Sequence, residues 1–250
     1  MKQKYYGKNI HNKGRNKGKY YDTKTQIRKY YDIRAVADHK YHTKKVFQIL
    51  DKYHPYAFYK SLDIACADGG TSIFIKNKFG IECHGIDLSP HSVKLANKNG
   101  IIAQVHDIRE KLPYRDNMFD LVIGLEIIEH VLDTDHFIAE VHRVMRKNGI
   151  CIITTPNLCS FTNRMRVLFG QYTAHGCQWN AEKGHHIVYT MPTLVKHFEQ
   201  YKFKIIKKTC SSIPFPMYSK KVPEAFKQIA MKLGDYFYNF GSHIIIVARK

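Results

Sequence analysis

Short apolar runs alternate with longer stretches of mixed polarity through the middle of the chain. The runs cover residues 62–65, a segment closing on Asp87, 101–105 and 121–125, and a helical stretch at 71–79 separates the first two. Buried parallel strands read as short apolar runs, whereas the helices that connect them carry a mixed pattern. The pattern therefore predicts strands that alternate with helices, which is the arrangement of an α/β domain.

The same alternation continues to the end of the chain. Ser89 and Pro90 suit the N-cap and the first position of a helix that extends to residue 99. Further helices are predicted at 33–54, 134–147 and 192–201, with Asp133 or Thr134 as the N-cap of the second. Further strands are predicted at 150–154, 203–208 and 243–248, and a long aromatic connection at 213–240. The prediction is thus a sheet of seven strands.

Composition divides the chain into a tail and a domain. At 250 residues and 44% apolar content, the chain suits one α/β domain with additions. Residues 1–30 are rich in Lys, Asn, Gly and Tyr without an apolar period, so they are predicted to form a basic, flexible tail. The domain then covers 31–250. Within it, the polar segment 158–183 follows the fifth strand and is predicted to be a lid-like insertion.

The charge of the chain is strongly positive and unevenly placed. The formal net charge is +19, which points toward nucleic acid or an anionic membrane surface. Residues 1–60 hold 16 Lys and Arg against 4 Asp and Glu. Lys and Tyr interleave in this N-terminal region, so it could bind RNA through charge and stacking. A solvated basic tail is the simpler interpretation of the same residues.

Cysteine usage and hydropathy indicate a cytoplasmic protein. The six cysteines are scattered and form no C-x-x-C pair, so we expect buried reduced thiols rather than a zinc or redox site. No segment approaches the ~20 apolar residues of a membrane span. The lysine-rich N-terminus lacks the apolar core of a secretory signal.

Small residues follow the first strand, and an acid closes the second. The turn places Asp63, Ala65, Ala67 and Gly69 at every second position. Small residues let backbone approach a ligand closely, and a helix start offers N–H groups to it. Asp87 stands where a carboxylate can accept both hydroxyl groups of a ribose. The stretch predicts a nucleotide-like ligand, and the lack of G-x-G-x-x-G argues against a dinucleotide.

This stretch resembles the first two motifs of the class I S-adenosylmethionine (SAM) dependent methyltransferases, whose turn is D-x-G-x-G-x-G. Ala65 and Ala67 replace two of the three glycines, and we expect the second change to loosen the cofactor site. The pairs Phe119-Asp120 and Glu129-His130 and the triplet Thr155-Pro156-Asn157 match later segments of the family in order.

The resemblance covers about residues 60–250 and implies a fold and a cofactor. The implied class I methyltransferase fold is a Rossmann-like sheet of seven strands, the last one antiparallel, flanked by helices. The implied cofactor is SAM, with Asp107 at the adenine amino group. The cofactor-binding residues are predicted to be Asp63, Ala65, Ala67, Gly69, Asp87, Leu88, Asp107, Ile108 and Glu126.

A cluster of ligand-type side chains follows the fourth strand. If this segment is helical, Glu126, Glu129 and His130 fall at i, i+3 and i+4, on one face. Such a set can bind a divalent metal or position a substrate. We expect that these residues brace the site through hydrogen bonds and that there is no metal. In the alternative, which resembles the small-RNA 2′-O-methyltransferases, His185 joins them around a divalent ion.

The chemistry of methyl transfer narrows the function. An oxygen nucleophile needs help in losing its proton, and His130, His185 and His186 are available, since imidazole titrates near neutral pH. We therefore predict catalytic roles for His130, His185 and Glu129. The preferred acceptor is a hydroxyl of a small molecule, such as a metabolite, quinone precursor, sugar or lipid.

Two other functions stay open at this point. One is RNA 2′-O-methylation with a divalent metal. The other is a non-catalytic SAM-fold binding protein, which the alanines of the loop motivate. Neither the Asn/Asp-Pro-Pro-aromatic motif of amino-group nucleic-acid methylases nor the Pro-Cys of cytosine-C5 methylases occurs in the chain.

Overall fold

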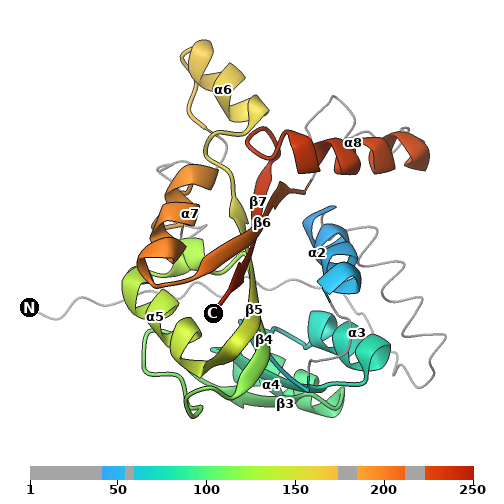
Figure 1. The fold of residues 1–250 in the computed structure, drawn as a ribbon, viewed down its shortest axis with the longest axis vertical. Helices are drawn as coiled ribbons and strands as arrows, with labels where there is room; N and C mark the ends of the chain where they lie inside the picture. The colour runs from blue at the N-terminus through green and yellow to red at the C-terminus, as the bar shows by residue number, and fades with distance from the viewer. Residues whose placement is uncertain (1–40, 54–58, 174–184, 212–222) are drawn as a thin grey trace, which may run out of the picture.

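A computed structural model describes residues 41–53, 59–173, 185–211 and 223–250 (Figure 1). Its strands are β1 Lys60–Ile64, β2 Glu82–Asp87, β3 Ile102–Val105, β4 Phe119–Leu125, β5 Met145–Pro156, β6 Lys204–Cys210 and β7 His243–Arg249. Its helices are α2 Tyr41–Tyr53, α3 Gly70–Phe79, α4 Pro90–Lys98, the 3-10 turn η1 Ile128–His130, α5 Thr134–Val144, α6 Phe161–Leu168, α7 Met191–Gln200 and α8 Glu224–Tyr236.

The seven strands form one sheet in the order β3-β2-β1-β4-β5-β7-β6. Strands β1 to β5 are parallel where they pair, and β7 runs antiparallel to both of its neighbours, β5 and β6. The order reverses at β1 and β4, where a parallel sheet opens a crevice at its carboxyl edge. The predicted Rossmann-like sheet with an antiparallel last strand is confirmed.

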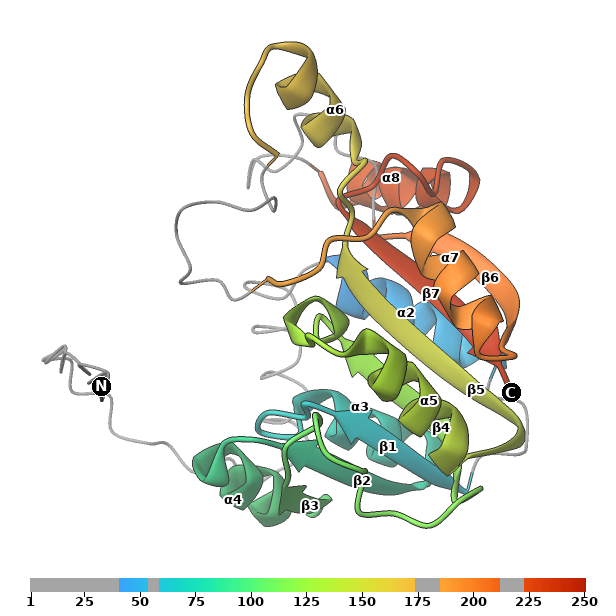
Figure 2. The ribbon, with the colours of Figure 1, turned by 90° about the vertical axis from the view of Figure 1, so that its left-hand side faces the viewer.

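Helices cover both faces of the sheet and enclose two cores (Figures 1 and 2). One core contains Phe137 of α5 and Phe198 of α7, packed on Leu62 of β1. The other contains Leu50 of α2 and Ile75 of α3, together with strand residues of the opposite face. Alternate residues of a strand point to opposite faces, which is why each strand supplies both cores.

Local signals set several element ends as predicted. The Ser89 side chain accepts a hydrogen bond from the backbone of Ser92, with Pro90 in the first turn of α4. The Asp133 side chain caps α5 by accepting from His136 N. Such caps satisfy backbone N–H groups that the helix leaves unbonded, so a short polar side chain there fixes the helix start.

Other element ends were predicted wrongly. The helix expected to reach residue 147 ends at Val144, because Met145 already pairs with Phe119 as the start of a 12-residue β5. The stretch 213–240, expected to be an aromatic connection, contains the 13-residue helix α8. Of the helix expected at 33–54, the described part forms α2; residues 1–40, including the predicted tail, lie outside the described residues.

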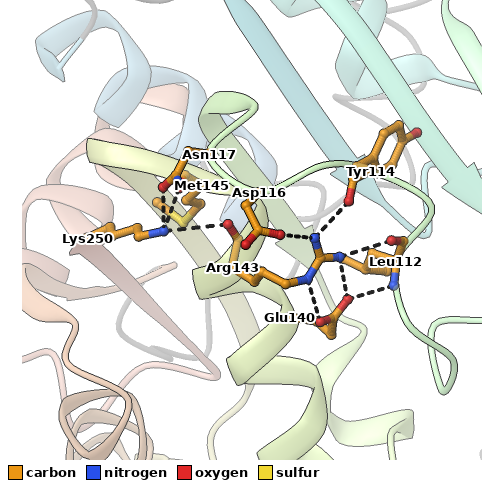
Figure 3. Close-up of polar contacts among 8 residues, drawn as sticks. All are labelled: Leu112, Tyr114, Asp116, Asn117, Glu140, Arg143, Met145 and Lys250. Carbon is orange, nitrogen blue, oxygen red and sulfur yellow. Dashed lines mark hydrogen bonds and ion pairs between the residues drawn. The ribbon is translucent and has the colours of Figure 1, made fainter.

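A polar network fastens the segment between β3 and β4 to α5 and the C-terminus (Figure 3). The Arg143 guanidinium donates to the backbone oxygens of Leu112 and Tyr114 and to the carboxylates of Asp116 and Glu140, at 2.7–3.0 Å. Glu140 in turn accepts from Leu112 N at 2.7 Å. The network fixes the chain that leads into β4, far from the carboxyl edge.

The described cysteines are free thiols, as predicted, and Cys177 lies outside the described residues. Within the described ranges, no helix is both long and apolar enough to cross a bilayer.

Candidate functional site

A cavity of about 430 Å³ opens at the carboxyl edge of the sheet, next to the ends of β1, β2 and β4. Its volume lies within the range of roughly 300–1,000 Å³ that small-molecule sites occupy. The lining residues are Ala65, Asp87, Leu88, His106, Asp107, Ile108, Arg109, Ile127, His130, Val131, Leu132 and His186. The cavity therefore coincides with the crevice that the sheet order creates.

The loop after β1 is built from residues in the left-handed region. Ala65 and Ala67 have φ values of 61° and 47°, and Gly69 has φ of 80°. A Cβ in this conformation meets the following carbonyl oxygen and costs roughly 1–2 kcal/mol per residue. Gly69 is the N-cap of α3 and has no side chain to cap it, while Asp68 Oδ1 accepts a hydrogen bond from Gly70 N at 3.2 Å. The loop thus keeps the glycine-type backbone of the resembled motif although two of its residues are alanine.

The Asp87 side chain ties this loop to β2. Its carboxylate accepts hydrogen bonds from Ala67 N at 2.9 Å and from Ser89 N at 2.8 Å. A carboxylate offers about four lone-pair sites, so capacity for ligand hydroxyls remains. Asp87 and the adjacent Leu88 both line the cavity.

Asp63 lies behind the loop rather than at the cavity. Its side chain is 4% exposed and accepts a hydrogen bond from Ser72 Oγ at 2.8 Å. Burial raises the pKa of Asp63 to about 7, and the nearby carboxylates of Asp87 and Asp68 push it in the same direction. Asp63 therefore connects β1 to α3 and fixes the loop between them.

Asp107 lines the cavity but is held by a neighbour. Arg109 donates from its backbone N and its guanidinium to the Asp107 carboxylate, and these bonds lower the pKa of Asp107 to about 2. His106, on the other side, has a buried Nε2 without a hydrogen-bond partner among the described residues. The cavity thus contains a carboxylate whose charged form Arg109 stabilises, next to the His106 imidazole, whose Nε2 can still bond a ligand.

Glu126 does not continue into a helix, and the predicted one-face triad is wrong. Its φ is 56°, and the 3-10 turn begins only at Ile128. The Glu126 carboxylate accepts from Thr154 Oγ1 at 2.8 Å and lies 3.2 Å from Nε2 of His243. The left-handed turn directs it toward β5 and β7, so Glu126 stands apart from Glu129 and His130.

Glu129, His130 and His185 come together beside the cavity, which His130 lines. Glu129 is 1% exposed and accepts a hydrogen bond from Thr155 Oγ1 at 3.0 Å. The rings of His130 and His185 lie 4.7 Å apart between centroids. One potential ligand atom from each of the three residues lies within 4.8 Å of the other two. The structure therefore assembles three members of the alternative metal set and leaves out Glu126.

The backbone explains how segments distant in sequence meet here. His186 N donates to the Glu129 carbonyl oxygen at 2.7 Å, and Ile187 N shares that acceptor at 3.3 Å. These bonds fasten the segment before α7 to η1. As a result, His186 lines the cavity while His185 faces His130.

Half of the predicted site residues line the cavity, namely Ala65, Asp87, Leu88, Asp107, Ile108 and His130. The other half lie behind or beside it, namely Asp63, Ala67, Gly69, Glu126, Glu129 and His185. The lining residues that the prediction did not assign are His106, Arg109, Ile127, Val131, Leu132 and His186. Their proximity to Asp107, His130 and His185 in the sequence was the available signal.

The residues present fit SAM. Asp87 and Asp107 can accept from hydroxyl and amino groups, while Leu88 and Ile108 offer apolar contact to a base. The N-terminus of the 10-residue α3 favours a negatively charged group, and the Asp68 carboxylate already accepts from Gly70 N there at 3.2 Å.

Residues 62–153 match the family model described as "Methyltransferase domain". The chain is similar to norajmaline N-methyltransferase of Rauvolfia serpentina, with 44% identity over 102 residues, which is 37% of this chain and 34% of the relative. It is also similar to the chloroplastic tocopherol O-methyltransferase of Arabidopsis thaliana, with 38% identity over 104 residues, 38% of this chain and 30% of the relative. In both cases the chain spans about a third of the relative's own length.

The fold resembles that of a solved protein across most of its length. A SAM-dependent methyltransferase of Thermotoga maritima, described as a possible histamine N-methyltransferase, superposes with a TM-score of 0.61 at 18% identity, over 90% of this chain and 96% of that one. The likeness therefore extends well beyond residues 62–153.

Proposed function

We propose that this chain, whose residues 62–153 match a methyltransferase domain and whose fold resembles that of a SAM-dependent methyltransferase, transfers a methyl group from SAM to a hydroxyl oxygen of a small molecule. The observation that carries the proposal is the Asp87 carboxylate, which lines the cavity while fastened to the loop by Ala67 N. Such fastening positions the carboxylate before a ligand arrives, so little ordering cost remains on binding.

Separate residues hold the cofactor and handle the proton. Asp87 would accept the ribose hydroxyls, Asp107 or His106 would bond the base, and the start of α3 would face the carboxylate. When bound, SAM supplies a methyl group activated by positively charged sulfur. His130 would accept the proton of the hydroxyl, and His185 and Glu129 would hold the His130 ring and stabilise its charged form.

The comparisons support a small molecule as acceptor. The two curated relatives are named for the methylation of an alkaloid nitrogen and of a tocopherol oxygen. An amine is thus a second candidate class, favoured by the first relative. Oxygen is preferred because the imidazoles of His130 and His186, which line the cavity, suit an acceptor that must lose a proton. RNA is the alternative acceptor that the basic N-terminal region suggests, and residues 1–40 lie outside the described residues.

The experiment measures SAM binding and methyl transfer separately. Calorimetry with SAM and S-adenosylhomocysteine should give binding to the wild type, and labelled SAM should then methylate members of a panel of phenols, catechols, amines and total RNA. Label on a phenol or catechol supports the proposal. Label on amines alone contradicts the oxygen acceptor, and label on RNA alone contradicts the small-molecule acceptor. Binding without transfer to any member supports a non-catalytic protein.

A further inference from the structure

Helix α8 carries an apolar stripe on its outer side. Phe226, Ile229, Leu233 and Tyr236 are all exposed, and their spacing of three, four and three residues places them on one side of the helix. Ala230, next to this stripe, and Met231, farther round the helix, are buried. Tyr236 is 80% exposed, which is high for a large aromatic side chain. The helix therefore has an apolar side beyond the one that it packs against the sheet.

The end of α6 carries a second group of exposed apolar side chains. Val167, Leu168 and Phe169 follow one another, and Tyr172 lies three residues later. Leu168 and Phe169 are 70% and 74% exposed. Consecutive exposed apolar residues at a helix tip are uncommon on a protein surface without a partner.

Aromatic contacts connect the two groups. The Phe240 ring lies 6.5 Å from that of Phe161, at the start of α6, and 6.3 Å from that of Phe237, just after α8. Phe161 N also donates to the Phe240 carbonyl oxygen at 2.9 Å. Figures 1 and 2 place α6 and α8 at the same end of the molecule. We call the exposed apolar residues of α6 and α8, joined through Phe240, the apolar end.

The charge around the apolar end is positive. Residues 158–173 contain Arg164 and Arg166 and no acidic residue. The Arg164 guanidinium lies over the Phe240 ring at 4.6 Å. Helix α8 holds Glu224 and Asp235 against Lys227 and Lys232, so the excess positive charge comes from the two arginines of α6. Lys232 is exposed, and Asp235 forms an ion pair with the buried Lys45 at 2.7 Å. The charges near the apolar side chains therefore attract an anionic surface.

We propose that the apolar end docks on an anionic lipid bilayer. Exposed Leu, Phe and Tyr side chains can enter the interface between headgroups and acyl chains, while the arginines contact phosphate groups. The net charge of +19 gives the whole chain a long-range attraction to the same surface. A soluble protein partner would not explain the pairing of arginines with apolar side chains at one tip as directly.

Docking would also bring the cavity close to the bilayer. Helix α6 begins five residues after the last residue of β5, and the cavity opens at that same carboxyl edge. Figure 2 shows α6 continuing from the end of β5 beyond the rest of the fold. A lipophilic acceptor could then reach the site from the membrane. This last step rests on the proposed function, whereas docking itself does not.

The test is co-sedimentation of the full chain with vesicles of phosphatidylcholine alone or mixed with phosphatidylglycerol. We expect binding to the anionic vesicles that weakens with salt. Leu168→Ser with Phe169→Ser should reduce the partition coefficient at least about tenfold, and Arg164→Gln with Arg166→Gln about fivefold per charge. Circular dichroism and melting verify that the variants are folded.

Matched controls lie at the opposite end of the molecule. Ile102→Ser with Val105→Ser removes two exposed apolar side chains, and Lys94→Gln with Lys98→Gln removes two exposed charges. Both should leave sedimentation unchanged. Equal losses in controls and tip variants, or no binding to anionic vesicles, would overturn the proposal. So would gel filtration showing a dimer that Leu168→Ser with Phe169→Ser dissociates, because the apolar end would then bind a second copy. Vesicle binding without activity would overturn only the proposed function.

Discussion

The carboxylate of Asp87 accepts a hydrogen bond from the backbone N–H of Ala67, with 2.9 Å between Oδ2 and N. This contact joins the end of β2 to the loop after β1, and both partners belong to the predicted cofactor site. The acid that would hold the ribose therefore also sets the conformation of the loop beside it.

We expect Asp87→Asn to weaken binding of S-adenosylhomocysteine by about tenfold or more. The amide keeps the shape but loses charge and acceptor capacity toward two backbone N–H groups, and leaving such donors unpaired costs about 1–3 kcal/mol. Calorimetry measures the affinity, and Glu82→Gln, at the other end of β2, is the control that should bind normally. An unchanged affinity in Asp87→Asn would remove Asp87 from the cofactor site.

Ala67→Gly should preserve or improve affinity for SAM. With φ at 47°, Ala67 bears a steric cost of roughly 1–2 kcal/mol that glycine avoids. Glycine also lowers the free energy of unfolding by about 0.4–1 kcal/mol, because it gives the unfolded chain more conformational freedom. The free energy of unfolding of Ala67→Gly should therefore equal that of the wild type or exceed it by up to about 1.6 kcal/mol.

Urea unfolding and calorimetry on Ala67→Gly test this result. Ala139→Gly, in the middle of α5, is the matched control, and its free energy of unfolding should fall by about 1 kcal/mol. If both substitutions destabilise equally, the positive φ of Ala67 carries no strain.

Asp63 should make the ligand-free protein less stable as the pH rises. Its folded-state pKa is raised to about 7 from 3.8, so its contribution is full below pH 3.8 and is lost as the pH rises through about 7. Asp63→Asn keeps an acceptor for Ser72 and has no carboxyl to ionise. The free energy of unfolding of Asp63→Asn, minus that of the wild type, should rise by on the order of 1–4 kcal/mol between pH 4 and pH 8.5.

Urea unfolding of both proteins at pH 4, 6 and 8.5 measures this difference. Asp51→Asn, at an exposed position on α2, serves as the control and should show no such trend. A difference between Asp63→Asn and wild type that does not change with pH would mean that Asp63 ionises normally in the fold.

Arg143→Ala should destabilise the fold by about 3–5 kcal/mol, because it leaves the largely buried Glu140 carboxylate without its cation. Arg143→Lys should still lower the free energy of unfolding by about 1–3 kcal/mol, since an ammonium cannot reproduce the forked geometry of the guanidinium. Arg115→Ala, at an exposed position, is the control, and its free energy of unfolding should stay within about 0.5 kcal/mol of the wild type. Affinity for SAM should be normal in folded Arg143→Lys, and a loss there would link the network to the site.

Local sequence patterns were sufficient to predict the features that depend on residues close together in the chain. The apolar runs gave the strands, Ser89 and Asp133 marked helix starts, and the loop spacing located the cavity at Asp87. These features depend on side-chain periodicity and on backbone groups a few residues away, which a sequence displays directly.

The features that the sequence pattern failed to predict depend on contacts between segments far apart in the chain. Met145 extends β5 because Phe119 of the adjacent strand offers a partner, which no local signal near residue 145 indicates. Glu126 turns left-handed, and its backbone N–H donates to the Thr154 carbonyl oxygen, so helical spacing gave the wrong face. His106 and Arg109 line the cavity through the position of their loop, and neither belongs to the resembled motifs.

The last prediction concerns metal, because Glu129, His130 and His185 have the composition of a divalent site. We expect methyl transfer to survive a chelator. Glu126, the fourth predicted ligand, is engaged by Thr154 and His243 away from this group.

His130 is the proposed proton acceptor at the cavity, so its loss should act on kcat. His130→Ala should lower kcat about 10²–10⁴-fold with little change in SAM affinity. His185→Ala should lower kcat less, and the exposed His91→Ala should be neutral. If a chelator abolishes activity and added Mn²⁺ or Mg²⁺ restores it, while Glu129→Gln abolishes the restoration, these three residues hold a metal and the proton-acceptor role of His130 is wrong.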